Sequence, residues 1–236
     1  MLITKSIIWN LYALAYNSIT ESTSYCRLIN SIVDYLDLKP GNKILDLGCG
    51  NGNLEVEIVK RNLEDIKITA VDISPQMLKR AKAKLKGNKK IEWVQMDIRQ
   101  GLNFPATSFD RIVLLHSLYT LPAPEEVLKN SARLLRKGGL LVLAEPRAQA
   151  KLFPVIKENF QEEGLVTAFF KIFLNLPSFF WIMLINQIFL KKEIKKSRAK
   201  LSEEQILPEL EKNRLTIKKK TTAYAGQDLV IVAQKI

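Results

Sequence analysis

The sequence predicts a doubly wound, Rossmann-like α/β fold with a mostly parallel, seven-stranded sheet. Three observations predict it. Short apolar runs alternate with amphipathic stretches between residues 43 and 144, a glycine-rich turn follows the first run, and two β-type segments at 215–234 are joined by a tight turn. Strands that alternate with helices form parallel sheets covered on both faces, whereas a tight turn joins antiparallel strands.

Residues 1–38 carry apolar side chains at helical spacing, which predicts two helices ahead of the sheet. Pro40 and Gly41 then interrupt the pattern. The first strand is expected at 43–47, and a helix to about Lys60 follows the glycine turn.

The second strand is expected at 66–71, and a helix then begins with Ser74 as its cap and Pro75 as its first residue. Serine accepts hydrogen bonds from the first helical turn, and proline has no N–H to leave unpaired there. The remaining predicted elements are strands at 91–96, 111–115 and 140–144, a helix at 124–135 ended by Gly138-Gly139, a helix from Ser202 to about Asn213, and an antiparallel hairpin of strands 215–224 and 228–234 joined through Ala225-Gly226.

The 236 residues are expected to form a single domain with four parts. Residues 1–38 supply the N-terminal helices, and 39–146 the ligand-binding core. Residues 147–200 form an apolar and then basic helical insertion or lid, and 201–236 the closing helix and hairpin.

The chain is basic, with a formal net charge of +12, which favours polyanionic partners or a solvated lysine-rich surface without choosing between them. Its cysteines, Cys26 and Cys49, form no CxxC pair, and His116 is the only histidine. We therefore expect no metal site, and a reducing, cytoplasmic location that includes peripheral contact with the membrane.

The turn Gly48-Cys49-Gly50-Asn51-Gly52 is the central functional signal. Glycines allow a sharp turn and close approach of a ligand at the carboxyl end of a strand. The dinucleotide fingerprint fails because its third glycine is replaced by Asn53, and a phosphate-binding P-loop fails because no Gly-Lys-Ser/Thr follows. Asp46, just before the turn, would repel a pyrophosphate but suits a ligand that carries an ammonium group.

Further side chains stand at successive strand ends. Asp72 can accept hydrogen bonds from both hydroxyls of a ribose. Asp97 can accept from an adenine amino group, and Ile98 and Met77 can pack on the ring. A helix cap for Asp72 and a surface loop for Asp97 are the alternatives.

The motifs ILDLGCGNG, VDIS with SPQML, VQMDI, FDRIVLLHSLYTLP and LLRKGGLLVLAEP resemble those of class I S-adenosylmethionine-dependent methyltransferases. Within that class they resemble the small-molecule group that includes the ubiquinone/menaquinone-biosynthesis enzymes, over about residues 10–146. The resemblance implies S-adenosyl-L-methionine as the cofactor. It implies cofactor contacts at Tyr16, Asp46, Gly48, Cys49, Gly50, Asp72, Ile73, Met77, Asp97, Ile98 and Leu115.

Two residues after the fourth predicted strand are candidates for catalysis. His116 is the one side chain there whose ordinary pKa suits a general base near neutral pH, and Tyr119 can orient an acceptor. For both, packing in the pocket wall is the alternative. The segment Leu114-Leu115-His116-Ser117 also lacks the motifs of adenine-N6 and cytosine-C5 methyltransferases, so nucleic acid is not the expected acceptor.

Residues 165–190 hold six Phe and one Trp, and 191–200 hold six basic residues against one acidic residue. Polar residues and Pro177 interrupt the apolar run, so we expect a helical hairpin on a membrane surface or over a hydrophobic substrate. An ordinary lid or a homodimer interface is the alternative.

The sequence thus predicts methyl transfer to a hydrophobic small molecule such as a lipid, a quinone precursor or a prenylated ring. An RNA methyltransferase that uses the basic surface is one alternative. A protein that binds the cofactor without turnover is another.

Overall fold

The computed structural model describes residues 2–13, 15–16, 20, 22–147, 150–185, 187 and 202–236. The helices are α1 (Leu2–Ala13), α3 (Thr23–Tyr35), α4 (Asn53–Lys60), α5 (Pro75–Lys84), α6 (Pro124–Leu134), α7 (Leu152–Glu163), α8 (Leu165–Ile185) and α10 (Glu203–Lys212), with short 3-10 turns η1 (Ile98–Gln100) and η2 (Leu118–Thr120). The strands are β1 (Lys43–Leu47), β2 (Lys67–Asp72), β3 (Ile91–Gln95), β4 (Phe109–Leu115), β5 (Leu135–Pro146), β6 (Leu215–Ala223) and β7 (Asp228–Lys235).

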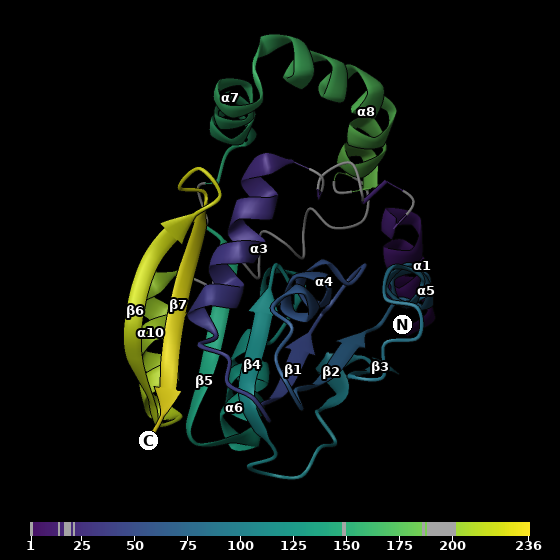
Figure 1. The fold of residues 1–236 in the computed structure, drawn as a ribbon. Coiled ribbons are helices and arrows are strands. Elements are labelled where there is room, and N and C mark those ends of the chain that lie inside the picture. The colour runs from purple at the N-terminus through teal and green to yellow at the C-terminus, as the bar shows by residue number, and fades with distance from the viewer. Residues whose placement is uncertain are drawn as a thin grey trace.

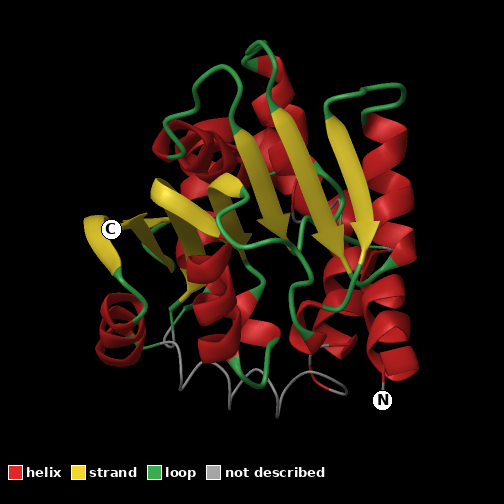
Figure 2. Ribbon diagram, turned by 90° about the horizontal axis from the view of Figure 1, so that it is seen from below, coloured by secondary structure: helices red, strands yellow, loops and turns green. Residues whose placement is uncertain are grey.

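One seven-stranded sheet runs in the order β3-β2-β1-β4-β5-β7-β6. Strands β1 to β5 pair in parallel, and β7 pairs antiparallel with both β5 and β6. Helices cover both faces of the sheet (Figures 1 and 2). The predicted fold class and the antiparallel edge are confirmed. Because Asp228 pairs with Pro146, the start of β7 lies beside the end of β5.

Strand β5 differs from its predicted course. It begins at Leu135, which pairs with Phe109, and includes Gly138 and Gly139, where we expected a helix end and a loop. The register with β4 shifts between Phe109 and Arg111. A Cβ on Gly139 would lie 2.9 Å from the carbonyl oxygen of Arg136, so the irregular strand needs glycine there.

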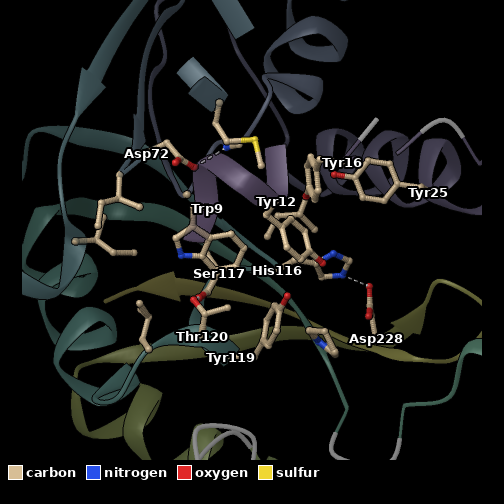
Figure 3. Close-up of a pocket in the computed structure, with 18 of the residues that line it drawn as sticks. Trp9, Tyr12, Tyr16, Tyr25, Asp72, His116, Ser117, Tyr119, Thr120 and Asp228 are labelled. Atoms are coloured by element: carbon tan, nitrogen blue, oxygen red, sulfur yellow. Dashed lines mark hydrogen bonds and ion pairs between the residues drawn. The ribbon is translucent and has the colours of Figure 1, made fainter. Parts of the chain in front are cut away.

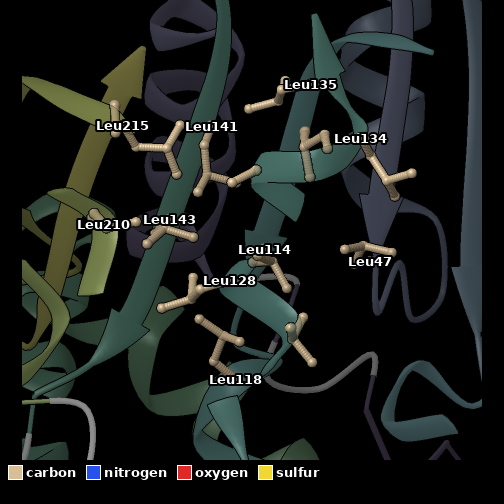
Figure 4. Close-up of a cluster of buried hydrophobic side chains, with 14 of the residues drawn as sticks. Leu47, Leu114, Leu118, Leu128, Leu134, Leu135, Leu141, Leu143, Leu210 and Leu215 are labelled. Carbon is tan, nitrogen blue, oxygen red and sulfur yellow. The ribbon is translucent and has the colours of Figure 1, made fainter. Parts of the chain in front are cut away.

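Two apolar clusters, one on each face, hold the layers together. Leu114, Leu141 and Leu143 face Leu128 of α6 and Leu210 of α10 (Figure 4). On the opposite face, alternate strand residues pack against α3, α4 and α5. Each such leucine stabilises the fold by roughly 1.5–3 kcal/mol through burial. This alternation decides which side chains of a strand can face α4.

Helices α1, α7 and α8 form a cover beyond the carboxyl ends of the parallel strands (Figure 1). The Ser24 hydroxyl at the start of α3 lies within hydrogen-bond distance of Glu158 (2.7 Å) and Asn159 (2.8 Å) of α7, to which its proton can be donated. The Trp181 indole of α8 donates to the Leu11 carbonyl of α1 (3.0 Å). The cover is therefore tied to the N-terminal helices by polar contacts.

The apolar insertion forms α7 and α8, with Pro177 inside α8. Within the described ranges, no helix has the length and hydropathy needed to cross a bilayer. Phe189 and the basic run 191–200 lie outside the described residues.

Candidate active site

The glycine turn between β1 and α4 brings three elements into close contact. The amides of Gly48 and Cys49 donate to the Val71 carbonyl at 2.8 and 2.9 Å. Gly48 has φ +92°, and a Cβ there would lie 2.7 Å from the Ser117 Cβ. L-residues with side chains rarely adopt this backbone conformation. The turn can therefore lie against the end of β4 only because position 48 has no side chain.

Asp72 ends β2 and connects this turn to α5. Its carboxylate accepts hydrogen bonds from the amides of Gly50 (2.9 Å) and Ser74 (2.7 Å), while the Ser74 hydroxyl caps α5 at Met77 N (3.1 Å). Burial raises the pKa of Asp72 to about 6. A carboxylate has about four acceptor positions, so Asp72 keeps acceptor capacity for a hydroxyl donor after its backbone amides bind.

A cavity of about 430 Å³ opens at the carboxyl ends of the strands (Figure 3). This volume lies in the range typical of small-molecule sites. Most of the predicted site residues line it: Tyr16, Gly48, Gly50, Asp72, Ile73, Met77, Asp97, Ile98, Leu115, His116 and Tyr119. Asp46 and Cys49 do not line the cavity, and both are buried.

Asp46 instead forms a buried acidic pair with Glu55 of α4 behind the turn. Burial raises the pKa of Asp46 to about 7, and burial together with the charge of Asp46 raises the pKa of Glu55 well above its usual range. The folded protein therefore binds these protons more tightly than the unfolded chain does. The resulting stabilisation is complete below the unfolded pKa values, near 4, and is lost as the pH rises through the folded ones.

Asp97, at the start of η1, is bound by Arg99. The guanidinium donates to both carboxylate oxygens, at 2.7 and 2.5 Å. This bidentate ion pair fixes the carboxylate at the cavity wall, next to Ile98. The predicted contact with an adenine amino group would have to share the carboxylate with Arg99.

His116 directly follows β4 and has a left-handed backbone, with φ +51°. Its amide donates to the Ala144 carbonyl of β5 (2.9 Å). Its Nε2 lies 2.6 Å from Oδ2 of Asp228, the first residue of β7 (Figure 3). The rings of Tyr25 and Tyr224 lie 6.3 and 6.0 Å from the imidazole, centroid to centroid. The imidazole is thus held between a carboxylate and two phenol rings.

Glu145, near the end of β5, fixes the segment that carries His116 and Tyr119. Its carboxylate accepts hydrogen bonds from the amides of Ser117 (3.0 Å), Leu118 (2.9 Å) and Tyr119 (3.2 Å). Burial raises the pKa of Glu145 to about 7, although these hydrogen bonds and the neighbouring His116 oppose the shift.

Sequence reasoning missed several residues of this site. Glu145 stands at a strand end, as Asp72 and Asp97 do, so the same rule would have found it. Several other cavity-lining side chains that were not predicted are aromatic or lie at the hairpin, and no motif marks them: Trp9, Tyr12, Tyr25, Tyr224 and Asp228.

The sequence and fold are similar to those of known methyltransferases. Residues 45–143 match the family described as "Methyltransferase domain". The chain is 31% identical over 131 residues to 27-O-demethylrifamycin SV methyltransferase of Amycolatopsis mediterranei, which covers 54% of this chain and 47% of that protein. It is 32% identical over 118 residues to a ubiquinone/menaquinone biosynthesis C-methyltransferase of Cronobacter sakazakii, covering 48% and 46%.

A solved structure of a SAM-dependent methyltransferase from Aquifex aeolicus superposes with a TM-score of 0.61 at 16% identity, covering 88% of this chain and 89% of that one. The predicted resemblance is confirmed: the chain has the fold and the central motifs of the S-adenosylmethionine-dependent methyltransferases. It spans about half the length of these curated relatives.

Proposed function

We propose that this protein is an S-adenosylmethionine-dependent methyltransferase that acts on a hydrophobic small molecule, such as a lipid, a quinone precursor or a prenylated ring. One observation carries the proposal. A single cavity joins Asp72 and the glycine turn, at one end, to His116 and a set of aromatic side chains at the other. The cofactor supplies an electrophilic methyl group on a sulfonium. The protein must then align the acceptor with that methyl and exclude water.

The residues of the first half of the cavity fit this cofactor. Asp72 offers carboxylate acceptor positions at the cavity wall to the ribose hydroxyls, and Gly48 and Gly50 leave room for a ligand at the turn. Met77 and Ile98 are apolar side chains of the cavity wall that would pack on the adenine. None of these cavity residues requires a ligand that carries a phosphate.

The second half of the cavity fits an apolar acceptor. Tyr25 and Tyr224 line it beside the His116 ring, and Trp9 and Tyr12 of α1 line the cavity near Met77. Large aromatic surfaces favour flat or hydrocarbon-rich ligands, while the phenol hydroxyls can orient a polar group. Tyr119 is the proposed orienting residue for the acceptor.

We also propose that α8 rests on an anionic membrane surface, from which the acceptor would enter. Phe173, Leu174 and Phe180 of α8 are 60%, 72% and 63% exposed, and the basic run 191–200 follows in the sequence. Aromatic groups and neighbouring cations together bind interfaces of anionic lipid. Sedimentation with phosphatidylglycerol vesicles should recover the protein, and a Phe173→Ser/Phe180→Ser variant should bind at least ten-fold more weakly. The matched control is Ile236→Ser, another exposed apolar residue. Equal binding of all three proteins would refute the membrane contact.

Calorimetric titration with S-adenosylhomocysteine tests the central proposal. Wild-type protein should bind saturably, Asp72→Ala should lose at least 30-fold in affinity, and Asp65→Asn, at an exposed acidic residue, should not change it. Circular dichroism confirms that each variant is folded. A folded wild type that does not bind would refute the proposal. Binding without transfer to any lipid or quinone acceptor would favour the non-catalytic alternative, and salt-sensitive methylation of RNA would favour the nucleic-acid alternative.

A further inference from the structure

Asp228 is a buried carboxylate at the far wall of the cavity, and its side-chain partner is the imidazole of His116. It is 1% exposed, and the 2.6 Å contact to Nε2 joins two residues that lie 112 positions apart. Buried carboxylates are costly unless they are paired, and a buried ion pair stabilises a fold little more than apolar residues of similar size. Stability alone therefore does not account for this pair.

The backbone conformation of His116 also indicates a functional role for this residue. A left-handed residue that is not glycine costs about 1–3 kcal/mol, and such strain clusters at active sites. Two hydrogen bonds to β5 hold this conformation. The amide of His116 donates to the Ala144 carbonyl, and the amide of the next residue, Ser117, donates to the Glu145 carboxylate. The strained backbone sets the imidazole at the cavity wall, against Asp228.

We propose that His116 and Asp228 form a catalytic dyad that deprotonates a weakly acidic hydroxyl of the acceptor, a phenol or an enol, for methylation on oxygen. This assignment deepens the proposed function and rests on it. The Nε2 proton bonded to Asp228 fixes the neutral tautomer with its lone pair on Nδ1. Asp228 is a positioning residue, and His116 is the group that meets the substrate.

The step balances without any further reactant. The acceptor O–H bond breaks and its proton passes to Nδ1, while the oxygen forms a bond to the methyl carbon. The methyl–sulfur bond breaks, and its electron pair stays on sulfur. The imidazolium is neutralised by Asp228 until it releases its proton to water.

The class of acceptor can be narrowed by asking which functional groups must lose a proton to a base before they are methylated. A carboxylic acid is already ionised near neutral pH, and a protonated amine would bring a second positive charge to a site that holds a sulfonium. A phenol, with a pKa near 10, is neutral and enters an aromatic cavity without the cost of burying a charge.

Four elements place titratable groups around the imidazole. Tyr25 comes from α3, Tyr224 follows β6, Glu145 comes from β5, and Asp228 comes from β7. Lys151, ahead of α7, lines the same cavity. Burial raises the pKa of Tyr224 to about 12 and that of Tyr25 still further, so both phenols stay neutral across the working range. Among these groups, Asp228 is the carboxylate in direct contact with the ring.

Because the chain contains one histidine, NMR can titrate the dyad directly. The ¹⁵N shifts of the wild type should show the Nε2–H tautomer. Asp228→Asn should lower the pKa of His116 by about 1 unit or more, because it removes an adjacent negative charge. Asp65→Asn, an exposed control, should leave the pKa unchanged. A wild type in the Nδ1–H tautomer, or a pKa that does not fall in Asp228→Asn, would refute the dyad.

Turnover of two probe acceptors of similar shape distinguishes a role of the dyad in deprotonation from a purely structural role. At pH 7.5, 4-hexylphenol is protonated, whereas 4-hexylbenzenethiol is largely ionised and needs no base. Asp228→Asn and His116→Asn should lower kcat for the phenol by about 10²–10³-fold, and kcat for the thiol less than three-fold. Asparagine tolerates the left-handed backbone, so the second variant keeps the local fold.

An equal loss with both probes would overturn the proposal in favour of a structural role, and absence of phenol turnover by the wild type would overturn the acceptor class. S-adenosylhomocysteine titration of the same proteins shows whether the proposed function survives either failure. Retained binding leaves the methyltransferase proposal intact, whereas lost binding in the wild type refutes both.

Discussion

Substitution of Glu145 by alanine should destabilise the protein, and more so at acidic than at alkaline pH. Three backbone amides, those of Ser117, Leu118 and Tyr119, donate to this one carboxylate. Alanine leaves all three without their acceptor. Ser117 and Leu118 are buried, so water replaces the lost oxygen poorly there.

The magnitude follows from two opposing contributions. Each buried amide left unpaired costs about 1–3 kcal/mol, which sums to roughly 4 kcal/mol when two are buried and one is half-buried. Burial acts against the ionised carboxylate, because it raises the pKa of Glu145 to about 7 from an ordinary value near 4.5. A raised folded pKa gives stability that is present at low pH and is lost as the pH rises through 7.

Glu145 should therefore contribute about 2 kcal/mol more to stability at pH 5.5 than at pH 8.5. Glu145→Ala is expected to cost about 3 kcal/mol at pH 5.5 and about 1 kcal/mol at pH 8.5. Urea denaturation followed by circular dichroism at both pH values measures these differences. Glu92→Ala, at an exposed strand residue, should stay within about 0.5 kcal/mol at either pH. A cost that is equal at the two pH values, or larger at pH 8.5, would refute the claim that burial dominates the titration of Glu145.

Three further predictions address the turn, the acidic pair and the cover. Gly48→Ala should cost about 2–5 kcal/mol, because it combines a positive φ with a 2.7 Å contact to Ser117, and thermal denaturation that matched the wild type would contradict this. Glu55→Gln should stabilise the protein by about 1–3 kcal/mol at pH 8 and flatten its pH dependence between pH 5 and 8, since it removes one of two adjacent buried acids. A variant less stable than the wild type at pH 8 would contradict the claim that the two buried acids destabilise the fold at that pH. Ser24→Ala should speed amide exchange in α7 while the exchange of β4 stays unchanged, because Ser24 binds Glu158 and Asn159. Unchanged exchange in α7 would show that other contacts hold the cover.

The sequence predicted the parallel core well, because local patterns determine it. Apolar runs of strand length, a glycine turn after β1 and the Ser74-Pro75 helix start are all local signals. The predicted start of β5 was wrong because Leu135 is apolar and directly follows a segment with a strong helical pattern. Only its pairing with Phe109 makes it part of the strand.

The cavity was predicted less completely, for two physical reasons. Asp46 follows Leu45 and precedes Leu47, and both leucines pack on the α6 side, so strand alternation turns Asp46 toward α4 and away from the cavity. The sequence does not mark Asp228, because the acidic side chains predicted for the site all stand at or near the ends of parallel strands, whereas Asp228 begins an antiparallel one. An antiparallel strand begins where its parallel neighbours end, so its first residue also reaches the site.

The order of the strands has a consequence for how such a site can change. Most residues proposed to hold the cofactor end or follow β1, β2 and β3, whereas those proposed to face the acceptor follow β4 or lie in the β6–β7 hairpin. The hairpin turn, with Tyr224, Ala225 and Gly226 all at positive φ, supplies Tyr224 and Asp228 within five consecutive residues. Grafting this short turn from a relative, with Asp228 kept for the proposed dyad, would exchange part of the wall proposed to face the acceptor and leave the proposed cofactor wall intact. Under the proposed function, residues 224–227 are therefore a short segment through which acceptor selectivity can be altered without touching the cofactor side.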